Sequence, residues 1–151
     1  MKGIYTIILR LENRTKCKIG ALGSYSFRRG IYLYTGSACG RGSTSIEGRM
    51  RRHEGKRRRS FWHIDYLLRA GIWEILAFVY STTDRSFECN ANAQIRESTQ
   101  ASFPVMGFGS SDCRCPSHLL YLERRDVRRT LNKVKRAYRE IGLKPRLSRL
   151  G

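Results

Sequence analysis

The sequence predicts an α/β domain in which helices flank a small, mainly antiparallel central sheet. Two strand-like runs of apolar, aromatic and β-branched residues, 3–11 and 31–38, are joined by a glycine-rich stretch of hairpin character. Residues 125–142 repeat apolar positions at helical spacing. The 151 residues are enough for one compact domain with its own core. We expect this domain over residues 1–142, with an inserted hairpin near 12–29 and a basic tail at 143–151.

The first half of the chain is expected to form a small sheet through local pairings. Residues 3–11 alternate between two faces, and the polar turn "ENRTK" ends this strand. The glycine-punctuated residues 17–30 predict one or two short strands in a hairpin, and residues 31–38 predict the next strand. An inserted hairpin would leave the strands at 3–11 and 31–38 adjacent.

Two helices are expected after this sheet. Residues 43–55 predict the first helix, because Thr44 and Glu47 have the spacing of a capping box. Residues 61–71 predict the second helix, with Gly71 as its C-terminal stop.

The rest of the chain alternates between strand and helix signals. The elements expected are a buried strand at 72–80, a helix at 88–99, a structured loop at 103–117, a strand at 118–123 and a helix at 125–142. The last helix places Val127, Leu131, Val134, Tyr138 and Ile141 on one face, opposite a densely basic face. Residues 143–151 are expected to be a frayed tail.

The charge points to a polyanionic partner. Thirty Lys and Arg residues against twelve Asp and Glu residues give a formal net charge of +18. Nucleic acid is the first candidate, because each neutralised phosphate releases counterions. An acidic membrane is disfavoured, since the sequence has no apolar anchor and no run of roughly 18 apolar residues. We expect DNA as the partner and no membrane contact, and the lack of a signal-peptide pattern predicts a cytoplasmic location.

A small sheet followed at once by an arginine-bearing helix suits phosphodiester hydrolysis. That reaction needs an activated water, a cation to stabilise charge on the phosphorane, and relief for the leaving oxygen. Mg²⁺ or Mn²⁺ held by a carboxylate meets two of these three requirements. The planar guanidinium of an arginine can bind two phosphate oxygens at once. A tyrosine hydroxyl can position or deprotonate the water if charged neighbours lower its pKa.

Three segments carry a resemblance to a known family: "KGIYTI" at 2–7, "YTGSA" at 34–38 and "GRMRRH" at 48–53. Together they resemble the GIY-YIG nuclease superfamily, in which two strands carry the tyrosine motifs and the following helix carries a catalytic arginine. The segments "WHIDYLL" and "GFGSSDCRCPSHLLYL" resemble an uncharacterised, mostly prokaryotic branch sometimes fused to endonuclease III-type DNA glycosylases. The resemblance implies a metal-dependent DNA endonuclease, with a DNA-repair glycosylase as a further partner.

The resemblance also implies roles for individual residues. The catalytic residues it implies are Tyr5, Tyr34, Arg49, His53 and His63. It places the Mg²⁺ ligand on a later helix, where Glu88 is the best match and Glu97 the rival. Tyr5 and Tyr34 are further apart than the usual motifs, so Tyr32 is an alternative to Tyr5 as the first tyrosine. The late asparagine of the superfamily has no clear match, and Asp112 is a candidate for its role.

The cysteines suggest a second metal. Cys113, Cys115 and His118 have spacing that suits three zinc ligands, with Cys89 as a candidate fourth. The alternative is a tight turn with buried thiols. An odd count of five cysteines favours reduced thiols or a metal site over a disulfide framework.

Basic residues beside these motifs are expected to contact the DNA backbone and not to specify sequence. They are Lys56, Arg57, Arg58, Arg59, Arg128 and Lys135. The function expected is a metal-dependent endonuclease that acts on damaged or structured DNA in repair. A noncatalytic nucleic-acid-binding module and a zinc-stabilised adaptor for a repair protein are the alternatives, and RNA stays open as a substrate.

Overall fold

The structure is a computed structural model that describes residues 1–55, 62–70, 72–84, 86–111, 113–123 and 126–149. Its strands are β1 (Lys2–Leu11), β2 (Thr15–Lys18), β3 (Ser24–Phe27), β4 (Gly30–Cys39), β5 (Glu74–Thr82), β6 (Leu119–Leu122) and β7 (Arg146–Arg149). Its α-helices are α1 (Ile46–Glu54), α2 (His63–Arg69), α3 (Glu88–Thr99) and α4 (Val127–Glu140). The predicted fold class is confirmed, because these residues form an α/β domain around a five-stranded antiparallel sheet of order β6-β4-β1-β5-β7.

The centre of the sheet is the long pairing of β1 with β4. The pairing is antiparallel and places Tyr5 opposite Gly36 and Ile7 opposite Tyr34. The chain between these strands forms the separate β2–β3 hairpin, so the inserted hairpin predicted near residues 12–29 is present. The two strands expected to be adjacent therefore lie side by side.

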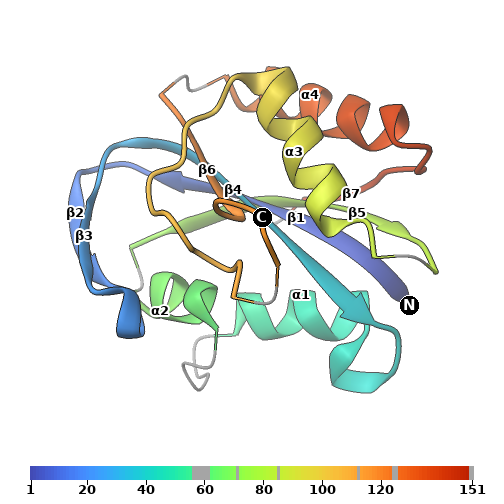
Figure 1. The fold of residues 1–151 in the computed structure, drawn as a ribbon, viewed down its shortest axis with the longest axis horizontal. Coiled ribbons are helices and arrows are strands. Elements are labelled where there is room, and N and C mark those ends of the chain that lie inside the picture. Colours follow the sequence, from blue (N-terminus) through green and yellow to red (C-terminus); the bar gives the residue numbers. More distant parts are fainter. Residues whose placement is uncertain (56–61, 71, 85, 112, 124–125, 150–151) are drawn as a thin grey trace.

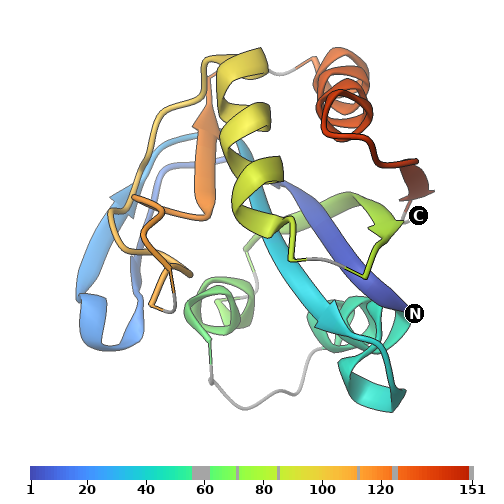
Figure 2. The same cartoon turned by 45° about the vertical axis from the view of Figure 1, so that its right-hand side comes forward.

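The sheet divides the core into two layers (Figures 1 and 2). One face carries Tyr5, Tyr34 and the buried side of α2, with α1 and the β2–β3 hairpin on the same side. The other face carries Ile4 and Ile8, covered by α3 and α4. The alternating pattern of β1 explains this division, because successive side chains of a strand point to opposite faces.

Several element boundaries differ from the sequence predictions. The predicted capping box of Thr44 and Glu47 does not begin α1, because the side chain of Ser45 accepts the backbone N–H of Gly48 at 3.0 Å instead. The predicted tail is not wholly frayed, since Arg146–Arg149 forms β7 along the edge of β5. Leu147 explains this ordering, because it packs against the core layer beneath α4. The predicted stop of α2 at Gly71 lies outside the described residues.

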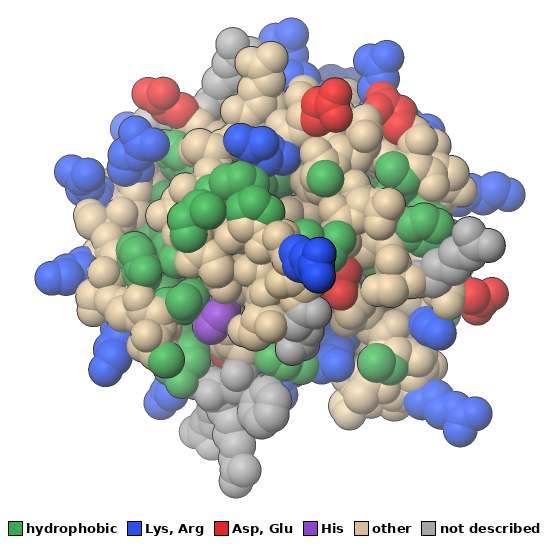
Figure 3. All heavy atoms as spheres, viewed as in Figure 1, with side chains coloured by type: hydrophobic (Ala, Val, Ile, Leu, Met, Phe, Trp, Pro, Cys, Tyr) green, Lys and Arg blue, Asp and Glu red, His purple; other side chains and the backbone are tan. Residues whose placement is uncertain are grey.

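The surface carries many basic side chains together with hydrophobic ones. Lys and Arg side chains lie mainly around the edge of the face in Figure 3, while hydrophobic side chains gather near its middle. Met106, on the segment between α3 and β6, is 61% exposed. Among the described residues, no helix combines the length and the apolar composition that crossing a membrane requires.

Candidate active site and metal cluster

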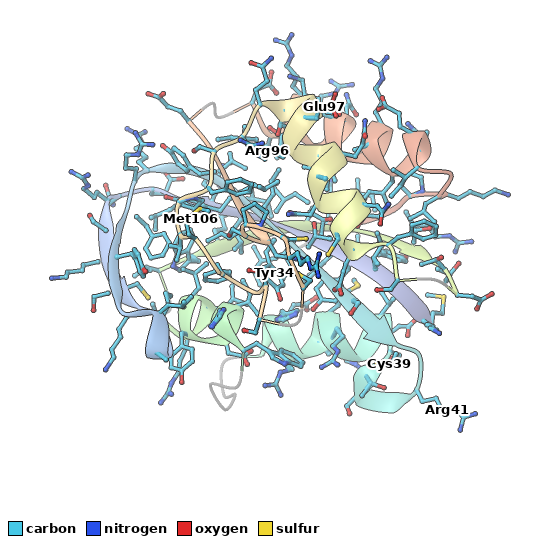
Figure 4. All side chains as sticks on the ribbon, viewed as in Figure 1. Tyr34, Cys39, Arg41, Arg96, Glu97 and Met106 are labelled. Atoms are coloured by element: carbon cyan, nitrogen blue, oxygen red, sulfur yellow. The ribbon has the colours of Figure 1, made fainter. Side chains whose placement is uncertain are left out.

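A cavity of about 420 Å³ opens beside the outer edge of β4. Its walls come from β1, β4, the two helices α1 and α2, the first residue of α3 and the segment that precedes β6. The lining residues are Tyr5, Tyr34, Thr35, Gly36, Ser37, Arg49, Trp62, His63, Glu88, Gly109, Ser111, Cys113 and His118. Figure 4 shows Tyr34 in the middle of the molecule, where these elements meet.

Unequal strand lengths explain why the cavity lies here. β4 runs to Cys39, whereas β6 pairs with it only from Ile31 to Tyr34. One further hydrogen bond joins the backbone N–H of Thr35 to the carbonyl oxygen of His118, at 3.3 Å. Beyond Thr35, the described residues place no strand along this edge, and the space is lined by side chains.

The two predicted tyrosines lie together on one face of the sheet, and both line the cavity. The hydroxyl of Tyr5 lies 2.8 Å from Nε2 of His53, which is fully buried in α1 behind the cavity wall. Tyr32, the alternative to Tyr5, lies elsewhere, because its hydroxyl donates to the carbonyl oxygen of Arg28 within the aromatic core. The structure therefore places Tyr5, and not Tyr32, at the cavity.

Both cavity tyrosines are weaker acids than free tyrosine. Burial raises the pKa of Tyr5 and of Tyr34, and the negative charge of Glu88 raises the pKa of Tyr34 further. Arg49 lowers both pKa values, but burial outweighs it. Neither tyrosine therefore meets the condition for deprotonating the water through a lowered pKa, and both hydroxyls are protonated at neutral pH.

The predicted arginine stands at the cavity in a stacked arrangement. The guanidinium carbon of Arg49 lies 4.2 Å from the ring centroid of Trp62, and that of Arg52 lies 4.6 Å from the same ring. Asp65, fully buried, holds this group in place: one carboxylate oxygen accepts the Trp62 backbone N–H at 2.8 Å and Nη2 of Arg52 at 3.0 Å. Arg52 is thus paired with a carboxylate through Nη2. The buried Nε of Arg49 has no hydrogen-bond partner among the described residues.

His63 and Glu88 also reach the cavity. Nδ1 of His63 accepts the backbone N–H of Gly109 at 2.7 Å, so the ring ties α2 to the segment before β6. Glu88 is half-buried at the first position of α3. Its rival Glu97 is exposed near the opposite end of α3 and is absent from the cavity lining (Figure 4).

The two predicted DNA-contacting residues that the structure describes, Arg128 and Lys135, do not line the cavity. Arg128 and Lys135 lie on α4, which packs against the sheet face opposite Tyr5 and Tyr34. Lys56, Arg57, Arg58 and Arg59 lie outside the described residues, as does Asp112. Among the described residues, Arg49 is the Lys or Arg side chain that lines the cavity.

A second group of functional side chains forms a cluster beside the cavity. The ligand atoms of Cys89, Cys113, Cys115 and His118 all lie within 4.8 Å of one another, and this Cys₃His cluster could hold a metal ion. These are the four residues that the spacing suggested, and all five cysteines of the chain carry free thiols. Burial raises the pKa of the Cys89 thiol, and the adjacent thiols of Cys115 and Cys113 raise it further.

Sequence reasoning missed several residues of the site. Trp62 and Asp65 had a usable signal, because an acidic residue three positions after a helix-capping residue often accepts the capping backbone N–H. Gly109 and Ser111 had no signal in the sequence, since they lie in a segment without regular periodicity. They reach the cavity only through tertiary contacts.

The chain belongs to the family described as "Domain of unknown function DUF123", whose model matches residues 4–143. No match was found among curated proteins or among solved structures. The family is separate from the GIY-YIG nuclease superfamily, so the predicted membership of that superfamily is wrong. The expectation of a glycosylase partner rested on that resemblance alone.

Proposed function

We propose that the protein is a metal-dependent endonuclease that hydrolyses phosphodiester bonds in DNA. The observation that carries the proposal is Arg49, which lines the cavity and whose buried Nε lacks a hydrogen-bond partner among the described residues. A buried donor is costly to leave unpaired, and a guanidinium matches two phosphate oxygens at once. The net charge of +18 supports a polyanionic substrate.

The side chains suggest how the reaction proceeds. Arg49 binds the scissile phosphate and stabilises the charge that grows on its oxygens during attack. The hydroxyls of Tyr34 and Tyr5 orient the attacking water. As the water oxygen bonds to phosphorus and the bond to the leaving oxygen breaks, the water proton passes to Tyr5 and the hydroxyl proton of Tyr5 passes to Nε2 of His53. The 2.8 Å hydrogen bond between Tyr5 and His53 supports this relay, as does the protonated state of Tyr5.

The half-buried carboxylate of Glu88 fits a hard divalent ion. Mg²⁺ is commonly held by one or two carboxylates together with substrate phosphates and waters, so a single cavity carboxylate is sufficient. When bound, Mg²⁺ or Mn²⁺ would supply charge stabilisation for the leaving oxygen. Zinc suits the softer thiolates of the Cys₃His cluster better and would take no part in hydrolysis.

The experiment is a cleavage assay on plain, nicked, abasic and flapped DNA duplexes and on one RNA duplex, with and without Mg²⁺. We expect Mg²⁺-dependent cutting of at least one DNA substrate. Arg49→Ala should lower the cleavage rate by about 10²- to 10³-fold, the usual effect of removing a donor to the transition state. Glu88→Gln should lower the rate and raise the Mg²⁺ concentration needed for half-maximal cutting.

Two exposed residues on the same helices provide matched controls. Arg51→Ala removes an arginine from the outside of α1, and Glu97→Gln changes a carboxylate at the far end of α3. Both controls should cut like the wild type. Wild-type cutting by Arg49→Ala and Glu88→Gln would refute this site.

The basic face of α4 favours a second candidate function, a noncatalytic nucleic-acid-binding module. Arg128, Arg129 and Arg136 are exposed on the side of the sheet away from the cavity. Such residues can hold nucleic acid through its phosphates without any hydrolysis. Salt-sensitive DNA binding without cutting of any substrate would favour this function over the endonuclease.

A further inference from the structure

The Cys₃His cluster (Cys89, Cys113, Cys115 and His118) joins two parts of the chain that are distant in sequence. Cys89 is the second residue of α3, and the other three residues lie in the segment between α3 and β6. That segment has little regular structure, and it is folded back by backbone hydrogen bonds such as Gly107 N–H to the carbonyl oxygen of Pro116 at 2.7 Å. A link at the cluster would therefore fasten an irregular segment to a helix.

The spacing of the donor atoms fits one tetrahedral ion. Zn–S bonds of about 2.3 Å and Zn–N bonds of about 2.0 Å place two sulfurs about 3.8 Å apart, and sulfur and nitrogen about 3.5 Å apart. Nε2 of His118 lies 3.3 Å from Sγ of Cys113 and 3.7 Å from Sγ of Cys89. The fourth donor, Cys115, completes a set whose atoms are all within 4.8 Å of one another.

The imidazole of His118 is oriented as a metal ligand. Its Nδ1 lies 2.9 Å from the carbonyl oxygen of Thr35, and a carbonyl can only accept, so Nδ1 carries the proton. Nε2 then keeps its lone pair, and this atom faces the thiols. A ligating histidine is commonly fixed in this way by a hydrogen bond from its other ring nitrogen. His118 is only 2% exposed, so the orientation is enforced by the fold.

We infer that Cys89, Cys113, Cys115 and His118 form a closed, structural zinc site that fastens the segment between α3 and β6 to the start of α3. Four protein ligands fill a tetrahedral ion and leave no position for a substrate, which separates a structural site from a catalytic one. Glu88 precedes Cys89, and the segment carries Gly109 and Ser111 at the cavity. A zinc ion at this site therefore holds two walls of the cavity in place. The importance of these walls for DNA cleavage rests on the proposed function.

The test measures zinc by mass spectrometry in the full chain purified without chelator and reconstituted with Zn²⁺. We expect one equivalent per chain in the wild type and in Cys39→Ser, a matched control whose exposed thiol lies away from the cluster (Figure 4). Cys89→Ser and Cys115→Ser should bind zinc at least 10-fold less tightly, because each removes a thiolate ligand. Cys115→His offers a replacement ligand and should retain zinc, which separates lost ligation from lost folding.

A second readout uses Co²⁺ in place of zinc. The wild type should give the thiolate charge-transfer bands of tetrahedral Co²⁺, and Cys115→Ser should weaken them. A wild type that stays free of zinc after reconstitution, or a full zinc content in both serine variants, would overturn the inference. Arg49→Ala should carry zinc like the wild type whether or not it cuts DNA, so failure of the zinc site and failure of the proposed function are distinguishable.

Discussion

Gly36 leaves room for the hydroxyl of Tyr5, and its replacement by alanine tests how tightly that hydroxyl is held. A Cβ atom at position 36 would lie 2.7 Å from Oη and 2.8 Å from Cζ of Tyr5, whereas ordinary contacts begin at 3.4 Å. The tyrosine must therefore move by about 0.7 Å, which is the difference between these distances. Tyr5 is only 2% exposed and belongs to the packed core on its face of the sheet, so neighbouring side chains restrain the movement of its ring.

The size of the effect follows from this displacement. A shift of about 0.7 Å is large compared with the narrow range of hydrogen-bond distances, so it should distort the 2.8 Å hydrogen bond between Tyr5 and His53. Overpacking of a dense core costs about 1 to 3 kcal/mol, and we expect Gly36→Ala to lower the free energy of unfolding by an amount in this range. If Tyr5 orients the attacking water, a displacement of this size should also lower the cleavage rate by about 10- to 100-fold.

Urea denaturation measures the first effect, and single-turnover cleavage measures the second. Gly55→Ala is the matched control, because its Cβ would meet the nearest carbonyl oxygens at an ordinary 3.4 Å. It should leave the stability and the rate nearly unchanged. A Gly36→Ala protein with wild-type stability and wild-type cleavage would refute the reasoning that packing at residue 36 fixes the tyrosine hydroxyl.

Two further predictions concern α2. Burial lowers the pKa of His63 in the fold, so the unfolded chain binds the proton first and the melting temperature should fall as the pH drops below about 6.5. His63→Gln keeps an acceptor for the Gly109 backbone N–H and should flatten this dependence in thermal melts at pH 7.5 and 5.5; an unchanged slope would contradict it. Asp65→Asn removes the charge that pairs with Arg52, and because Arg52 is partly exposed we expect a loss of about 2 to 3 kcal/mol in urea denaturation. Asp65→Asn with wild-type stability would show that the pair contributes little.

The sequence predicted those parts of the fold that depend on local pattern. Alternation along residues 3–11 was enough to place Tyr5 on one face of β1, and the inserted hairpin accounted for its distance from Tyr34 in the sequence. The thiol and imidazole spacing around Cys113 led to the Cys₃His cluster in the same way. The alternation along β1 and the spacing of Cys113, Cys115 and His118 are signals that lie within a few residues of the chain.

Features that depend on tertiary contacts were missed. β7 forms because β5 presents a free edge and Leu147 finds a place in the core, which no local pattern around Arg146 indicates. The raised pKa values of Tyr5 and Tyr34 could not be predicted for the same reason, since burial depends on what packs above the sheet. The local pattern could not distinguish Arg49 from Arg52, because only tertiary contacts place Arg52 beside Asp65 and Arg49 at the cavity.

His118 connects the cavity to the Cys₃His cluster through the backbone of Thr35. The carbonyl oxygen of His118 accepts the Thr35 N–H at 3.3 Å, and its ring Nδ1–H donates to the Thr35 carbonyl at 2.9 Å. The imidazole thus takes the place that the backbone N–H of a continuing strand would occupy. The backbone hydrogen bonds between β4 and β6 therefore end at His118. The same ring presents Nε2 to the thiols, and the edge of β4 beyond it is left for the cavity.

Cys115 lies in the cluster but not in the cavity lining, so its substitution separates the effect of losing the metal from direct damage to the site.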